Sequence, residues 1–290
     1  MTINFNREKT SARSLDLNHG QFAESMIEIR GLQFAYPDGT SVIGDISQSV
    51  PIGSTLGVVG PSGCGKSTLL AIIAGLLTPT GGSIELPLKG SDHQLAMLFQ
   101  QDTVLPWLTV RANVALFARF KSHGLRPSIF RNFARNRNVL RDPALRKRVD
   151  ELLALVDLSN LADRYPYQLS GGQRRRLAFL TAVAPEPRIL LLDEPLSSLD
   201  EPTRVGVHQD MFRISRLMGM TIILVTHDLA EAISLSDRVV VLSKAPSSIS
   251  FEHDVPFGSE RNMLELRNTP EFLQLYGDVW ENLSAQMVKD

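Results

Sequence analysis

The spacing of apolar residues predicts strands along much of the chain. Residues 26–36 (MIEIRGLQFAY) alternate between apolar and polar positions like a half-buried strand, and the PDG that follows indicates a turn. Short apolar runs without alternation are typical of strands buried on both faces of a parallel sheet. Such runs occupy residues 188–193, 221–226 and 238–243, and shorter strand candidates occupy residues 54–60 and 95–100.

Helical spacing separates these strands. Residues 66–77 (KSTLLAIIAGLL) have this spacing and end at TPTGG, and Asp228 is a suitable N-cap for the segment DLAEAISL. The alternation of strands and helices predicts an α/β sheet with right-handed crossovers.

The strand pattern stops between Arg111 and roughly Pro187. Residues 144–158 have a helical apolar face formed by Leu145, Val149, Leu152, Leu153 and Val156. We therefore predict a mostly helical subdomain at about 111–187, inserted into an α/β domain at 26–245.

Both ends of the chain differ from this core. Residues 1–25 have few large apolar residues and no periodicity, which predicts a flexible extension. Residues 246–290 contain weak strand signals and then a predicted closing helix at 269–287. The apolar face predicted for that helix consists of Phe272, Leu273, Leu275, Tyr276 and Trp280.

Composition excludes several classes of protein. A formal net charge of −1 gives no field that would attract nucleic acid, so no nucleic-acid partner is expected. The single cysteine, Cys64, excludes an intrachain disulfide and fits a reducing compartment. The polar N-terminus lacks the apolar core of a secretory signal. No run approaches the ~18 apolar residues of a membrane span, so work at a membrane would require spans from another chain.

Residues 119–148 contain ten Lys or Arg residues and one acidic residue, Asp142. A basic surface near anionic lipid headgroups is one interpretation of this segment. A solvated helical surface is the other, and we favour it.

A P-loop is the clearest chemical motif. GPSGCGKS matches the phosphate-binding pattern G-x-x-x-x-G-K-[ST], and it lies between a predicted strand and a predicted helix. Its backbone amides and helix dipole attract phosphate, Lys66 can reach the β- and γ-phosphates, and Ser67 can bind Mg²⁺. The predicted nucleotide contacts are Gly60, Pro61, Ser62, Gly63, Cys64, Gly65, Lys66, Ser67 and Thr68. Because Cys64 lies within the loop, we expect its alkylation to block ATP binding and bound ATP to protect it.

Further candidates follow other strands of the predicted sheet. Asp193 ends the run 188–193 and can hold Mg²⁺, while the adjacent Glu194 points to the opposite side and can act as the general base. His227 and Gln100 also follow strands, so they can contact the γ-phosphate, and the Gln100 amide oxygen can ligate Mg²⁺. The ring of Tyr36 can stack on a purine, although a core or turn tyrosine is an equal alternative.

A second phosphate-binding feature is LSGGQRRR, residues 169–176. It offers a serine hydroxyl, flexible backbone amides and the start of a helix, but no lysine and no metal ligand. These groups make half of a phosphate site. We assign the three arginines mostly to the helix surface.

The order P-loop, Gln100, LSGGQ, LLLDEP, SSLD and His227 resembles the ATP-binding subunit of an ABC transporter. The resemblance implies a P-loop NTPase core with a mainly parallel sheet, an antiparallel β subdomain and the inserted helical subdomain. It also implies that Ser170, Gly171, Gly172 and Gln173 bind the γ-phosphate of ATP held by a second copy of the chain. The roles it implies are Tyr36 for the A-loop, Gly60 to Thr68 for Walker A, Gln100 for the Q-loop, Asp193 and Glu194 for Walker B and the catalytic glutamate, Ser197 to Asp200 for the D-loop, and His227 for the switch histidine.

Residues 99–114 (FQQDTVLPWLTVRANV) and the segment TPEFLQLYGDVWENL resemble the importer branch for nitrate, sulfonates and taurine. This implies transmembrane permease partners, indirect work with a periplasmic substrate-binding protein, and a peripheral position on the cytoplasmic face of the inner membrane. Three alternatives remain: an exporter or lipid-translocation ATPase, a soluble non-transport ABC ATPase, and a non-hydrolysing scaffold. The long basic segment 119–148 and the extra residues 1–25 depart from the branch pattern.

Overall fold

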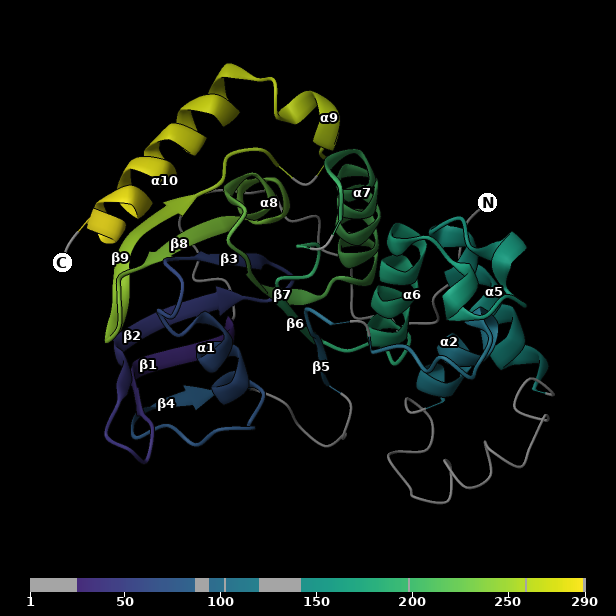
Figure 1. Ribbon diagram of the computed structural model, residues 1–290, viewed down its shortest axis with the longest axis horizontal. Helices are drawn as coiled ribbons and strands as arrows, with labels where there is room; N and C mark the ends of the chain where they lie inside the picture. The colour runs from purple at the N-terminus through teal and green to yellow at the C-terminus, as the bar shows by residue number, and fades with distance from the viewer. Residues whose placement is uncertain are drawn as a thin grey trace.

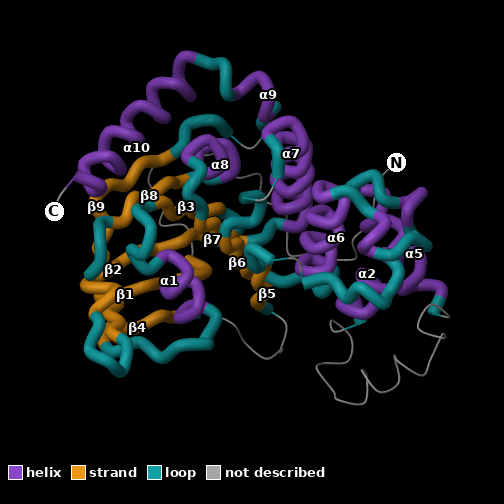
Figure 2. The backbone as a smooth tube through the Cα atoms, in the orientation of Figure 1, coloured by secondary structure: helices purple, strands orange, loops and turns teal. Residues whose placement is uncertain are grey.

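The computed structural model describes residues 25–86, 94–101, 103–119, 142–197, 199–258 and 260–288 of the 290-residue chain. Figures 1 and 2 show the strands gathered in a sheet, with helices packed around it. The strands are β1 (Ser25–Ala35), β2 (Ser41–Pro51), β3 (Thr55–Val59), β4 (Gly81–Glu85), β5 (Leu95–Leu98), β6 (Ile189–Asp193), β7 (Thr221–Val225), β8 (Arg238–Leu242) and β9 (Ser247–Asp254). The helices are α1 (Lys66–Ile73), α2 (Val110–Ala118), α5 (Pro143–Leu155), α6 (Gly171–Val183), α7 (Glu201–Met218), α8 (Leu229–Leu235), α9 (Met263–Leu266) and α10 (Pro270–Val288), with 3-10 turns at Ser159–Leu161 and Pro166–Gln168.

The centre of the sheet is parallel. Strands β8, β3, β7, β6 and β5 are neighbours in that order, and each adjacent pair runs parallel. β3 and β7 are buried along their whole length, as the continuous apolar runs predicted. Because the strands are parallel, the loops after β3, β5, β6 and β7 meet at one edge of the sheet, where α/β proteins bind ligands.

An antiparallel group extends the sheet on its other side. β1 pairs antiparallel with β2 and β4, and β9 joins this group to the core by pairing parallel with β2 and antiparallel with β8. The predicted strand at 26–36 is confirmed as β1. The antiparallel β subdomain of the predicted fold class is also confirmed.

The helical subdomain lies beyond β5, where α2, α5 and α6 pack together (Figure 1). Its described segments, 111–119 and 142–187, contain no strand, as predicted. On α5 the side chains of Val149, Leu152 and Leu153 are buried, which confirms the predicted apolar face. Most of the basic segment, residues 120–141, lies outside the described residues, as does the N-terminal segment 1–24.

The C-terminal segment covers α8 and the edge of the core (Figure 1). Its anchor is Arg261, whose guanidinium donates hydrogen bonds to the carbonyls of Ser234 (2.9 Å) and Ser236 (2.7 Å). It also lies over the ring of Phe212, 5.1 Å from the centroid. Desolvation lowers the pKa of Arg261 to about 10, so the side chain is still charged at neutral pH.

The predicted closing helix is present as α10, but its predicted apolar face is partly wrong. Phe272 and Leu275 are buried against α8 and β8, whereas Leu273, Tyr276 and Trp280 are exposed. The helix is apolar on two sides, and the sheet covers only the side whose spacing continues to Val279 and Leu283. The helix predicted at 66–77 is also shorter than expected, because Gly75 adopts a left-handed conformation (φ 72°).

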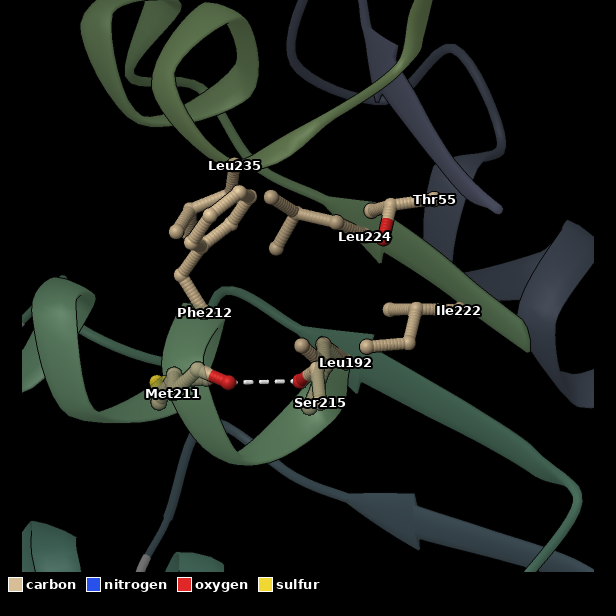
Figure 3. A pocket seen from close by; sticks show the side chains of 8 residues that line it. All are labelled: Thr55, Leu192, Met211, Phe212, Ser215, Ile222, Leu224 and Leu235. Carbon is tan, nitrogen blue, oxygen red and sulfur yellow. Dashed lines mark hydrogen bonds between the residues drawn. The ribbon is translucent and has the colours of Figure 1, made fainter. Parts of the chain in front are cut away.

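A cavity of about 10 Å³ lies between α7 and the sheet (Figure 3). Its lining is mainly apolar, and the hydroxyl of Ser215 is already bonded to the carbonyl of Met211 at 2.6 Å. The cavity is far too small for a nucleotide, so the ligand site must lie elsewhere. No helix in the described segments combines the length and apolarity needed to cross a membrane.

Candidate functional site

The P-loop connects the end of β3 to the start of α1, as predicted. Gly63 and Gly65 have positive φ values of 78° and 95°, which curl the backbone. A Cβ atom at Gly65 would also lie 2.6 Å from Cγ1 of Val42. Glycine is therefore required at position 65 both for conformation and for space.

Lys66 is almost fully buried at the centre of this loop. Its ammonium group donates hydrogen bonds to the carbonyl oxygens of Gly60 and Pro61, both at 2.9 Å. These carbonyls hold the charge inside the loop, where phosphate oxygens can replace them as partners. The position of Lys66 fits its predicted role.

Cys64 differs from its predicted environment. Its thiol is 1% exposed and packs in the apolar cluster that contains Val58 and Leu69. Desolvation raises the pKa of this thiol, although the charge of Lys66 opposes the effect. The thiol lies under the loop, 3.9 Å from the ammonium group of Lys66, and its burial should slow its alkylation.

Ser67 and Asp193 meet at the sheet edge. The Ser67 hydroxyl donates to Oδ1 of Asp193 at 3.0 Å, which joins the start of α1 to the end of β6. Desolvation raises the pKa of Asp193, while the Ser67 hydrogen bond opposes this rise. A hydroxyl and a carboxylate are the hard oxygen ligands that Mg²⁺ uses together with substrate phosphates.

Glu194 is joined to both His227 and Gln100. Its Oε2 lies 3.3 Å from Nδ1 of His227 and accepts a hydrogen bond of 3.4 Å from Nε2 of Gln100. Gln100 also donates to the hydroxyl of Ser197 at 3.3 Å. Three residues that follow three different strands are therefore brought together, as the strand order predicts.

The backbone of Glu194 explains why its side chain turns away from Asp193. Simple strand alternation predicted this separation, but β6 ends at Asp193 and Glu194 has a left-handed φ of 46°. A non-glycine residue in this region carries strain of about 1 kcal/mol. Its amide is held by the carbonyl of Val225 at 2.8 Å, which anchors the turn to β7.

Tyr36 lies beside the P-loop although it comes from the antiparallel group. Its hydroxyl is 3.4 Å from Oγ1 of Thr68, and its ring packs edge-on against Phe34. The ring is 41% exposed, which leaves a face for a purine base. Of the two alternatives for Tyr36, this position favours the stacking role over a core role.

The LSGGQ motif forms the start of α6. The Ser170 hydroxyl accepts a hydrogen bond from the amide of Gln173 (3.3 Å), and the Gln173 side chain accepts one from the amide of Ser170 (2.9 Å). This capping box leaves the hydroxyl proton of Ser170 and the amides of Gly171 and Gly172 free to donate to an anion. A Cβ at Gly172 would lie 2.4 Å from Cγ2 of Thr203, so glycine is required where α6 meets α7.

The motif is not in the same place as the P-loop. Figure 1 shows α1 and α6 on different sides of the molecule. The start of α6 therefore offers phosphate-binding groups to a ligand other than the one at the P-loop of its own chain.

One arginine of the run 174–176 contacts the backbone of the site residue Gln100, which the sequence pattern did not predict. Arg175 is 2% exposed and donates to the carbonyl oxygens of Phe99 (2.7 Å) and Gln100 (3.2 Å). Arg176 is also paired, with Asp210 at 2.8 Å. Assigning these residues mostly to the helix surface was therefore wrong. The helical period was a signal for this burial, because Arg175 lies one turn before the buried Phe179 and therefore on the same face of α6.

Comparison with known proteins agrees with this geometry. A family model described as ABC transporter matches residues 43–197, just over half of the chain. The chain belongs to the ABC transporter family. Within this family it is 39% identical to the aliphatic sulfonates import ATP-binding protein SsuB 2 of Agrobacterium fabrum, over 91% of this chain and 92% of that protein. It is also 35% identical to the taurine import ATP-binding protein TauB of Jannaschia sp., over 86% and 91%.

Solved ABC cassettes have the same fold. The dimeric cassette MJ0796 in a post-hydrolysis state, bound to ADP and Pi, matches with a TM-score of 0.64 and 28% identity, covering 80% of this chain and all of that one. The chain is therefore an ATP-binding subunit, and the residues at the sheet edge are its candidate ATPase site.

Proposed function

We propose that this chain hydrolyses ATP to drive an importer for a small anion of the nitrate, sulfonate or taurine class. The observation that supports the proposal is the meeting of Ser67 with Asp193, and of Gln100 and His227 with Glu194, at one sheet edge. The names of the relatives SsuB 2 and TauB support the class of substrate.

Phosphoryl transfer to water requires positioning and charge stabilisation more than covalent chemistry. Lys66 and the P-loop amides bind the phosphates of ATP. Glu194 orients the attacking water and accepts its proton, and His227 contacts both Glu194 and the γ-phosphate. Gln100 reports the presence of the γ-phosphate, because it contacts Glu194 and follows β5.

Ser67, Asp193 and the amide oxygen of Gln100 are the residues that would hold Mg²⁺. The ion supplies charge neutralisation of the phosphates. The raised pKa of Asp193 suits this role, because a bound cation favours the ionised carboxylate that burial alone disfavours.

A second copy of the chain completes each site in this proposal. The start of α6, with Ser170, Gly171, Gly172 and Gln173, binds the γ-phosphate held by the P-loop of the other copy. One two-fold axis then produces two equivalent sites. The dimeric state of the related cassette MJ0796 supports this assembly.

The remaining partners are transmembrane permease subunits, and indirectly a periplasmic substrate-binding protein. Three exposed aromatic residues support a docking surface for the permease. Phe99 and Trp107 lie close to Gln100 in sequence, and Tyr167 belongs to the helical subdomain. Such a partner places the chain at the cytoplasmic face of the inner membrane.

Co-expression tests this proposal. The chain should co-purify with transmembrane permease subunits when the two are expressed together. In vesicles, its ATP hydrolysis should rise several-fold when a cognate binding protein and taurine, an alkanesulfonate or nitrate are supplied together. Binding protein without its ligand is the control. If no anion of this class changes the rate of ATP hydrolysis by the complex, the substrate assignment is contradicted. Failure to co-purify with a permease would contradict the transport role.

A further inference from the structure

Hydrogen bonds and ion pairs join polar residues into a closed ring that includes both sequence neighbours of His227. The ring connects four parts of the chain. It joins α7, the loop after β7, α8 and the C-terminal segment. We call this set the switch ring; its members are Glu201, Arg204, His208, Thr226, Asp228, Glu231 and Arg267.

The first half of the ring links α7 to the loop that carries His227. Arg204 donates to Oδ2 of Asp228 at 2.8 Å and lies 3.2 Å from Oε2 of Glu201. It also donates to the carbonyl of Leu199 at 2.7 Å. Desolvation alone would raise the pKa of Asp228, but the amide of Glu231 and the charge of Arg204 outweigh it and lower that pKa. The carboxylate is therefore ionised at neutral pH.

The second half runs through buried groups. The Thr226 hydroxyl donates to Oε2 of Glu231 at 2.5 Å, and Oε1 of Glu231 lies 3.2 Å from Nε2 of His208. Nδ1 of His208 lies 3.2 Å from a guanidinium nitrogen of Arg267, which also pairs with Glu201. The amide of Asp228 closes the ring by donating to the Thr226 hydroxyl at 3.0 Å.

These contacts determine the proton positions. A guanidinium can only donate, so Nδ1 of His208 accepts from Arg267 and the ring proton lies on Nε2, where it donates to Glu231. His208 and Glu231 are 0% and 2% exposed, so water cannot replace a lost partner. Arg267 is the single ring member that comes from the C-terminal segment.

His227 itself has little packing to hold it. Its side chain is 61% exposed and contacts Glu194 at 3.3 Å. The direction of its ring therefore depends on the backbone between Thr226 and Asp228, and both of these residues belong to the switch ring. A change at Arg267 reaches this backbone through His208 and Glu231.

We propose that Arg267 is a positioning residue for His227, so that the C-terminal segment sets the rate of ATP hydrolysis through the switch ring. This inference rests on the proposed ATPase function. It assigns a role in hydrolysis to a segment outside the P-loop, LSGGQ and strand-end motifs.

The test is Arg267→Met in the full chain, which retains the apolar stem and removes the donors. We expect turnover of ATP to fall about tenfold, a typical coupling between contacting groups, while ATP affinity and KM stay unchanged. In a His227→Ala background the same substitution should change the residual turnover by less than about twofold, because the residue it positions is gone. Arg267→Lys should restore part of the loss.

Arg238→Met is the matched control, because Arg238 also pairs with two acidic residues, Glu252 (2.7 Å) and Asp254 (2.6 Å), but lies outside the ring. It should leave turnover unchanged. Equal losses from Arg267→Met with and without His227, or no loss at all, would overturn the inference. If Arg267→Met does not fold, the milder Arg267→Lys is compared in the same two backgrounds, with the same criterion. Wild-type chain that binds but never hydrolyses ATP would instead contradict the proposed function.

Discussion

Two adjacent acidic residues at the end of β6 have separate partners. Asp193 faces Ser67, and Glu194 faces Gln100 and His227. The left-handed backbone at Glu194 produces this division, at a cost that the hydrogen bond to Val225 helps to offset. One carboxylate is therefore placed for a cation and the other for a water molecule.

Glu194→Gln tests the second role. The amide keeps the size of the side chain but cannot accept a proton from water. We expect ATP binding to be retained and steady-state turnover to fall by a factor of at least about 100, the usual contribution of a general base. Phosphate release and nucleotide affinity measure the two effects.

Glu186→Gln is the matched control for that experiment. Glu186 is another glutamate with positive φ (57°), but it pairs with Arg148 at 2.5 Å, away from the candidate site. Its replacement should leave turnover within about twofold of wild type, because none of its contacts involves Lys66, Asp193, Glu194 or His227. Turnover of the Glu194 variant similar to that of wild type would remove Glu194 from the mechanism.

Burial of Cys64 leads to a different prediction from the one its place in the P-loop suggested. The thiolate is the reactive form, and burial both raises the thiol pKa and blocks access. Iodoacetamide should therefore label the native chain at pH 8 at least about tenfold more slowly than the urea-unfolded chain. The rate should rise with pH beyond 9, because a pKa above the usual value delays ionisation.

MgATP should change this labelling rate little, because the side chain is already only 1% exposed without nucleotide. The unfolded chain with and without MgATP is the control for effects on the reagent. Rapid labelling that ATP suppresses would restore the first expectation, that the thiol lies in the phosphate path.

Elements buried on both faces could be predicted from the sequence, and those buried on one face less well. The runs that became β3, β6, β7 and β8 are continuous and apolar, because both faces of a parallel sheet are covered. β2 was not predicted, since Gly44 and Asp45 interrupt its alternation where the register shifts.

Side-chain environments were harder to predict than the elements that carry them. An arginine on a helix is usually exposed, yet Arg175 is buried because the carbonyls of Phe99 and Gln100 replace its water. On α10 two apolar faces competed, and only the tertiary fold selects the one with Phe272 and Leu275. The meeting of Gln100, Glu194 and His227 was predictable because each follows a strand of the parallel sheet and therefore reaches the same edge.

Arg175 also gives α6 a physical connection to the nucleotide-contacting loop. It holds the backbone at Gln100, while the start of the same helix carries Ser170. In the proposed dimer, the phosphate at Ser170 and the phosphate near Gln100 would belong to different ATP molecules, and Arg175 would connect both to the same helix.

In the whole molecule the P-loop and the start of α6 lie on different sides, which supports the proposal that each is half of a site. Ser170→Arg should leave ATP binding by the single chain unchanged, because Lys66 and its loop are intact. It should prevent ATP-driven dimerisation, because a bulky cation replaces the hydroxyl. Nucleotide affinity and sedimentation in ATP measure these two outcomes.

Mixing two inactive variants tests the shared site directly. Lys66→Ala removes the P-loop charge, so this variant alone has no intact P-loop, and Ser170→Arg alone has no intact LSGGQ motif. A mixed dimer has one intact site, with Lys66 from one copy and Ser170 from the other. An equal mixture should therefore recover some hydrolysis, up to about a quarter of the wild-type rate, since at most about half of the chains can pair into mixed dimers and each has one working site. Each variant alone at the same total concentration is the control. If both motifs served the ATP of their own chain, mixing could restore nothing, and the composite dimer would be excluded.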